Sequence, residues 1–220
     1  MRTKTLLLTA VLGVATVATS LAQAVYSVNI VGYINKALPT GFTMVANQLN
    51  ASPDNKVTTL FTAAAVNNMA VFKFNPATGG YVQLTFVDGA WEGDDLNMTL
   101  SPGEGVFVYS PSAVTATFVG EVQLTSSVTV PGGFSIISSV IPQKAALDAA
   151  PPAGLGFPIG ANDSTFQYNP ATGGYIQNSF VDGAWEGDGG GAAPQPEVAE
   201  AFFFYNAGAA KPWPRTFTVN

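Results

Sequence analysis

Short apolar segments separated by Gly, Pro, Asn and Asp run through most of the chain, and this punctuation is typical of all-β proteins. In the first half, the segments with strand character are 42–49, 71–74, 81–87, 105–109 and 115–120. With a hairpin partner after residue 89 they make about six strands, which predicts an antiparallel sandwich or a small barrel.

One hairpin can be placed in register from its turn. Asp88-Gly89 is a preferred two-residue type I′ turn, and it pairs Phe86 with Trp91 and Thr85 with Glu92. Side chains alternate along a strand, so Phe86 and Trp91 face the core while Thr85 and Glu92 lie on the opposite, polar face.

A short helix is predicted in the first half. Ser52-Pro53-Asp54 supplies an N-cap, a proline at the first helical position and an early acidic residue, which predicts a helix through about Phe61. The second half has only a weak equivalent, at 144–149. At most one short helix is therefore expected in each half.

The chain contains an internal duplication. Residues 72–94 match residues 166–188 at 18 of 23 positions, and weaker matches on both sides extend the unit to about 95 residues. A unit of this length is the size of a domain. We therefore divide the chain into a signal peptide (1–24), a first β repeat (25–120) and a second β repeat (121–220), which pack either as one unit or as two domains.

The ends of the repeats also resemble one another. Segments 30–32, 118–120 and 215–220 look like three versions of one strand, although there are two repeats. This surplus predicts that the two ends of the chain are strands that pair with each other and close the structure.

The first 24 residues have the pattern of a secretory signal. Arg2 and Lys4 precede an apolar run at 6–18, and 21–24 reads Leu-Ala-Gln-Ala, a small-x-small cleavage pattern that makes Val25 the expected mature N-terminus. The run is too short to span a bilayer, and no later run reaches the ~18 residues that a spanning helix needs. We expect export to the periplasm, the cell surface or the medium, with no transmembrane segment after cleavage.

Composition removes most catalytic chemistries. The sequence has no cysteine and no histidine, which excludes disulfides, thiol nucleophiles, Ser-His-Asp triads and Cys/His metal sites. Removal of the leader leaves 6 basic residues against 14 acidic ones, a net charge of −8, so nucleic acid is not an expected partner. We expect no cofactor and no resident metal.

The polar face of the hairpin is the candidate binding site. An aromatic ring beside an amide and a carboxylate is the chemistry that holds a carbohydrate, and the same set occurs in both repeats. An ordinary solvated sheet face, or a seam between the repeats, would show the same pattern. The candidate residues are Tyr81, Gln83, Glu92 and Asp94 in the first repeat and Tyr175, Gln177, Glu186 and Asp188 in the second.

These segments allow three other readings. Glu92 and Asp94, two positions apart, are within the carboxyl separations of glycosidases, although nothing nearby in the sequence would raise the pKa of one of them. With Asp95 and Asn97 they also offer hard oxygen ligands for calcium, without an EF-hand spacing. The three tryptophans are candidate sugar platforms, but Trp91 and Trp185 are expected in the core and Trp213 to be partly exposed.

The motifs outside the hairpin carry a resemblance. The elements are Val31-Gly-Tyr33, Gly41-Phe-Thr-Met-Val-Ala-Asn47, Pro102-Gly-Glu-Gly-Val-Phe107 and Phe118-Val-Gly-Glu-Val122. With them the chain resembles a family of secreted bacterial two-repeat all-β proteins to which no activity is attached. The second repeat departs from the pattern, with Ser138-Ser139 in place of Ala-Asn and Val198-Ala-Glu-Ala201 in place of Pro-Gly-Glu-Gly.

We therefore expect an exported, non-enzymatic β-protein with a structural or surface-interaction role. The alternative is a carbohydrate-binding module that uses the Tyr/Gln/Glu face of each repeat, with polysaccharide or another cell-surface component as partner. A third reading is a glycoside hydrolase based on the carboxylates.

Overall fold

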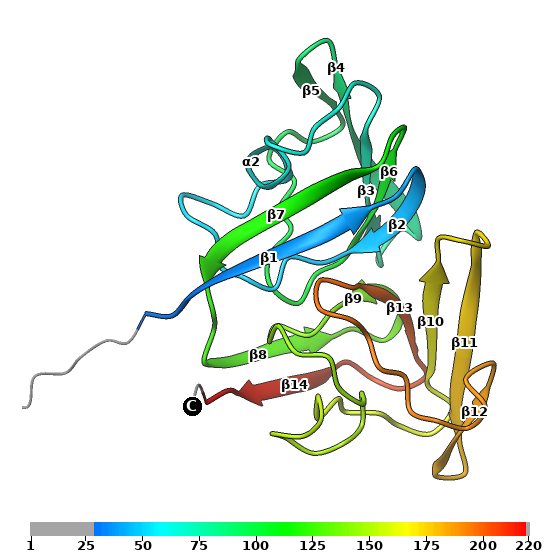
Figure 1. Cartoon of the computed structure of the whole chain (residues 1–220). Helices are drawn as coiled ribbons and strands as arrows, with labels where there is room; N and C mark the ends of the chain where they lie inside the picture. Colours follow the sequence, from blue (N-terminus) through cyan, green and yellow to red (C-terminus); the bar gives the residue numbers. More distant parts are fainter. Residues whose placement is uncertain (1–28, 219–220) are drawn as a thin grey trace, which may run out of the picture.

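The computed structural model describes residues 29–218 and confirms an almost entirely β chain built from two similar halves (Figure 1). The predicted signal peptide and its cleavage site lie outside the described residues. Within the described range the only helix is α2 (Val57–Leu60), and no helix there is long and apolar enough to cross a membrane.

Each repeat contains seven strands. The first has β1 (Val31–Leu38), β2 (Gly41–Val45), β3 (Ala70–Asn75), β4 (Gly80–Val87), β5 (Ala90–Gly93), β6 (Val106–Ser110) and β7 (Val114–Glu121). The second has β8 (Thr125–Val130), β9 (Gly133–Ile137), β10 (Ser164–Asn169), β11 (Gly174–Val181), β12 (Ala184–Gly187), β13 (Phe202–Asn206) and β14 (Lys211–Thr216).

The two repeats have the same topology. In each, the first and last strands form a two-stranded sheet, β1-β7 or β8-β14, and the other five form a larger antiparallel sheet. The order is β2-β6-β3-β4-β5 in the first repeat and β9-β13-β10-β11-β12 in the second, which is the same order shifted by seven strands. The small sheets lie on the left of Figure 1 and the five-stranded sheets on the right.

The predicted pairing of the two chain ends is wrong. β1 pairs along its whole length with β7, from Val31 opposite Glu121 to Leu38 opposite Val114, and β14 pairs with β8. Each repeat closes on itself by joining its own first and last strands, so neither end strand is left over for the other.

The helix prediction is only partly right. Asp54 does not start a helix; its carboxylate accepts a hydrogen bond from the Lys56 N–H (3.1 Å), and Lys56 stays extended in a β-bridge with Thr99. The helix therefore begins at Val57. Residues 144–149 form no helix, because their backbone groups bond to distant segments, as in the bond from Leu147 N–H to Pro194 O (2.9 Å).

The predicted hairpin is confirmed in both repeats. Asp88 and Gly89 have φ of 50° and 89°, as a type I′ turn requires, and Asp182 and Gly183 have 50° and 83°. The observed pairs include Phe86 with Trp91 and Thr85 with Glu92, and the second repeat has the equivalent pairs.

Each repeat has its own core between its two sheets. In the first repeat this core contains Leu38 of β1, Phe118 of β7 and Leu84 of β4, and Trp91 packs at its edge. In the second, Trp185 is buried among Phe202, Phe204 and Trp213.

Trp213 corrects a sequence prediction, because it is 1% exposed rather than partly exposed. Strand alternation turns its indole inward, toward the Phe157 ring at 4.7 Å between centroids. The indole N–H donates to the Leu155 carbonyl (2.9 Å), so burial leaves no indole polar atom unpaired.

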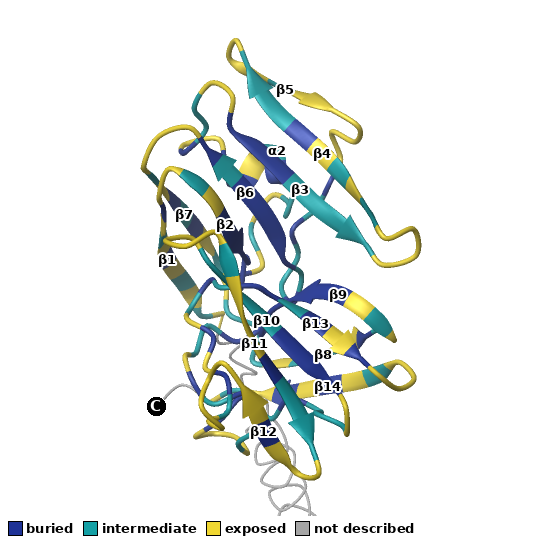
Figure 2. Cartoon of the chain, turned by 90° about the vertical axis from the view of Figure 1, so that its right-hand side faces the viewer, coloured by how far each residue is buried: buried dark blue, intermediate teal, exposed yellow. Residues whose placement is uncertain are grey.

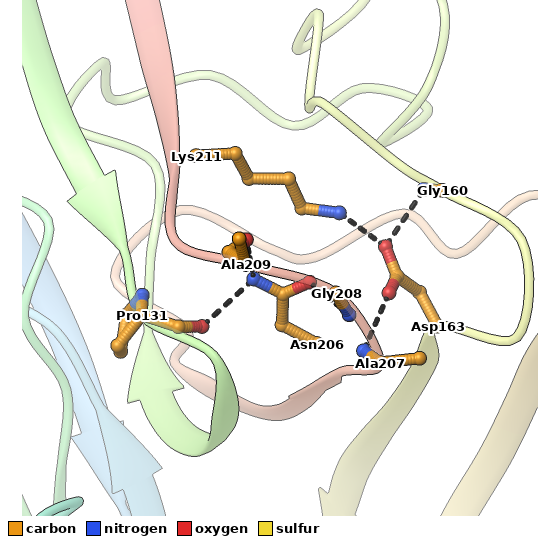
Figure 3. A network of polar contacts seen from close by, with 8 residues as sticks. All are labelled: Pro131, Gly160, Asp163, Asn206, Ala207, Gly208, Ala209 and Lys211. Carbon is orange, nitrogen blue, oxygen red and sulfur yellow. Dashed lines mark hydrogen bonds and ion pairs between the residues drawn. The ribbon is translucent and has the colours of Figure 1, made fainter.

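A buried polar network fixes the turns around β10 and β13 (Figure 3). The Asp163 carboxylate, 1% exposed, accepts from Lys211 Nζ and from the N–H groups of Gly160 (2.7 Å) and Ala207 (2.9 Å). The neighbouring Asn206 amide donates to two turn carbonyls. The first repeat has apolar Met69 and Val114 where the second has Asp163 and Lys211, so the two halves stabilise the same turns by different means.

Candidate functional site: an aromatic face shared by the two repeats

The outer face of each five-stranded sheet, away from its own core, is covered with aromatic rings. Residues directly opposite in the ladder share a face, so the register groups Phe72 with Phe107 and Phe74 with Tyr81, and the same holds in the second repeat. We call this surface the aromatic face; it consists of Phe42, Phe72, Phe74, Tyr81, Phe107 and Tyr109 of the first repeat and Phe134, Phe166, Tyr168, Tyr175, Phe203 and Tyr205 of the second.

Rings from the two repeats meet at the centre of the aromatic face. Phe107 contacts Tyr168 and Phe203 contacts Phe74, each with 5.3 Å between ring centroids and an edge-to-face orientation. Phe107 and Phe203 also contact each other, at 6.0 Å. Phe107 is equivalent to Phe203, and Phe74 to Tyr168, so exchanging the repeats exchanges the first two contacts. The repeats are therefore related by an approximate two-fold axis that passes between Phe107 and Phe203.

Backbone hydrogen bonds across the seam obey the same symmetry. Ala46 N–H donates to Ala199 O (3.2 Å), and the equivalent Ser138 N–H donates to Gly103 O (3.0 Å). Beside them, a Cβ on Gly105 would lie 2.4 Å from the Cβ of Ala201, so only a glycine allows this approach. The repeats share a closely packed seam.

Two grooves open on the aromatic face, one on each side of the seam. The larger, of about 540 Å³, is lined by Phe74, Gly79, Phe134, Phe166, Tyr175 and Phe203. The smaller, of about 330 Å³, is lined by Phe42, Phe72, Tyr81, Phe107, Tyr168 and Tyr175. In each groove, rings of one repeat are joined by residues from the central hairpin of the other, β3-β4 or β10-β11.

The grooves differ in polarity at one equivalent pair. Phe74 lines the larger groove where Tyr168 lines the smaller. Tyr175 lines both grooves, so the smaller groove has three tyrosines and the larger groove has one. Burial raises the pKa of Tyr81; burial, and then the neighbouring Tyr81 and Tyr168, raise the pKa of Tyr175. The three phenols thus lie near one another, and those of Tyr81 and Tyr175 stay protonated at neutral pH. None of them is hydrogen-bonded to another residue of the range 29–218.

Four of the eight predicted site residues flank the rings. Gln83 lies opposite Phe72 and Glu92 opposite Thr85, and Gln177 and Glu186 take the equivalent places. Each glutamate lies on the outermost strand of its sheet, β5 or β12. Toward the β5 or β12 edge of each sheet, the aromatic rings are therefore followed by amide, hydroxyl and carboxylate groups.

Asp94 and Asp188 have a structural position. Asp94 Oδ2 accepts from the Gln83 N–H (2.8 Å), and the Asp94 N–H donates to Gln83 O (2.9 Å). Gly93 has a φ of 142°, and beyond it the Asp94 carboxylate takes the place that a strand carbonyl would have opposite Gln83. Asp188 repeats this arrangement with Gln177.

One carboxylate oxygen of Asp94 is thus engaged by the backbone of Gln83. The oxygens considered for calcium also have partners in the chain: Asn97 Oδ1 accepts from Lys56 Nζ (2.9 Å), and Asp95 Oδ1 from the Asn97 N–H (2.9 Å). No group of three or more acidic side chains suited to a metal ion occurs within residues 29–218.

Most of the aromatic face was not predicted from the sequence. Tyr81 and Tyr175 were identified, whereas the phenylalanines of β3 and β6 and their counterparts were not. A signal was present, because Val71-Phe72-Lys73-Phe74 and Val106-Phe107-Val108-Tyr109 are large and largely apolar on both faces of their strands. A strand that faces water on one side does not need the second apolar face.

Comparisons with protein-family models, with curated proteins and with solved structures give no match for this chain.

Proposed function

We propose that this protein is an exported, non-enzymatic binding protein that holds a neutral polysaccharide on the aromatic face. The observation that carries the proposal is the exposure of aromatic rings beside phenol groups that have no hydrogen-bond partner among residues 29–218. Tyr81 and Tyr175 are 46% and 45% exposed, and Phe42 and Phe134 are 41% and 48% exposed. Apolar patches of this kind on a soluble protein mark binding surfaces.

The chemistry of the aromatic face matches that of a sugar chain. A pyranose ring presents an apolar C–H surface that packs on aromatic rings, and its hydroxyls need hydrogen-bonding partners at the rim. The grooves supply the rings, and the phenols with Gln83 and Gln177 supply donors and acceptors.

Charge favours a neutral polymer over an acidic one. No lysine or arginine belongs to the aromatic face, and its flanks carry Glu92 and Glu186 on a chain of net charge −6. An anionic polysaccharide would meet like charges at the edge of the binding surface.

The test is retention on insoluble polysaccharides. The protein, a Tyr81→Ala/Tyr175→Ala variant and a Tyr33→Ala control are applied to cellulose, chitin and an alginate gel. Tyr33 is 67% exposed but lies on β1, outside the aromatic face. Truncation of a hot-spot aromatic costs about 2 kcal/mol or more, and 1.4 kcal/mol is tenfold in affinity.

We therefore expect the protein and the Tyr33→Ala control to be retained on a neutral polymer and the double variant to lose at least about tenfold in affinity. Retention that is equal for all three proteins, or on alginate alone, contradicts the proposal. Retention on none of the polymers also contradicts it and leaves a protein partner as the reading of the exposed rings.

A further inference from the structure

We infer that each molecule holds two separate glycan chains, one in each groove and running in opposite directions, and so cross-links them. The inference rests on the proposed function and adds the number of chains and their orientation.

The first step is the equivalence of the two grooves. Five of the residues that line each groove correspond in pairs when the repeats are exchanged: Phe134 with Phe42, Phe166 with Phe72, Phe203 with Phe107, Tyr175 with Tyr81, and Phe74 with Tyr168. A ligand that fits one groove therefore meets nearly the same rings in the other.

The second step is the direction of the approximate two-fold axis. In Figure 2, the strands from β2 to β4 follow one another from left to right in the upper sheet, whereas β9, β13 and β10 follow from right to left in the lower sheet. The axis therefore points toward the viewer, out of the aromatic face. A two-fold rotation about such an axis reverses every direction that lies along the face.

The third step is the polarity of a polysaccharide. Its two ends differ chemically, so a chain seated in one groove in its preferred sense would have to run backwards in the other. One straight chain cannot satisfy both grooves in this way, but two antiparallel chains can. Each groove then binds a chain of its own, and the two grooves do not form one longer binding site.

Phe42 and Phe134 allow the grooves to be removed one at a time. They are equivalent, each lines only one of the two grooves, and both are exposed, so truncation to alanine leaves no buried cavity. The protein, Phe42→Ala, Phe134→Ala and the double variant are titrated calorimetrically with cellohexaose or chitohexaose, matched to the polymer that retains the protein. Thermal unfolding confirms that each variant is folded.

We expect two sites in the protein, one in each single variant and none in the double variant. With a long soluble chain, hydroxyethylcellulose or glycol chitosan acetylated to a neutral polymer, the protein raises light scattering, whereas the single variants bind without raising it. One site per molecule overturns the inference and leaves the proposed function standing. Two sites without cross-linking also overturn it, because one chain then spans both grooves. Absence of binding to hexamer and polymer removes the proposed function and the inference together.

Discussion

The seam between the repeats can be tested at Gly105, where a single methyl group has a defined effect. Its added Cβ would lie 2.4 Å from Ala201 Cβ and 2.5 Å from Ile136 Cγ2. Carbon atoms pack best at about 3.5–4.0 Å, so both neighbours would have to move by about 1 Å or more. Both are buried at the seam, 0% and 7% exposed. We expect Gly105→Ala to lower the free energy of unfolding by about 1–3 kcal/mol.

The assay is urea unfolding followed by tryptophan fluorescence, with Gly80→Ala as the control. A Cβ on Gly80 would meet nothing closer than Thr78 Oγ1, at 3.6 Å, which is an ordinary contact. Neither glycine has a positive φ, so the two substitutions differ in the space around them. Adding Ala201→Gly to Gly105→Ala removes one of the two clashes and should show a favourable coupling of at least about 0.5 kcal/mol. If Gly105→Ala unfolds at the same urea concentration as Gly80→Ala, the close packing of the seam is refuted.

Two further outcomes are expected. Lys211→Met leaves the buried carboxylate of Asp163 without its counter-charge and should lower the free energy of unfolding in urea by about 3 kcal/mol. Lys73→Met breaks a more exposed ion pair and should lower it by about 1 kcal/mol or less. Equal losses of stability would refute burial of the ion pair as the cause. Because burial raises the pKa of Tyr81 and of Tyr175, their phenols stay neutral in the folded state above pH ~10, where unfolded tyrosines ionise. Stability should therefore fall as pH rises beyond about 10. A Tyr81→Phe/Tyr175→Phe variant should show a shallower fall of the unfolding temperature across about pH 8–11. An unchanged dependence of the unfolding temperature on pH would show that these two phenols are not its cause.

Local features of the structure followed from the sequence because they depend on residues close together in the chain. The Asp88-Gly89 turn requires two positive φ angles, and once it is placed the opposite pairs of the hairpin follow by counting. The same counting placed Trp91 and Trp185 on the core side and Tyr81 and Tyr175 on the other.

The errors have a common physical source, which is competition from distant partners. A helix was expected to begin at Pro53 after an N-cap at Ser52, but the bridge between Lys56 and Thr99 keeps that segment extended. Trp213 was expected to be partly exposed, yet pairing of β14 with β8 places it against Phe157.

The sequence by itself determined the all-β class, the duplication and the hairpin around Asp88-Gly89, because alternation and turn chemistry act over a few residues. Only the tertiary structure decided that β3 pairs with β6 and that the outer faces of the two sheets meet at Phe107 and Phe203. A strand with two apolar faces can bury the second face against a partner, or leave it open for a ligand. Here the approximate two-fold docking of the repeats does both, because it buries the centre of the aromatic face and leaves a groove on each side.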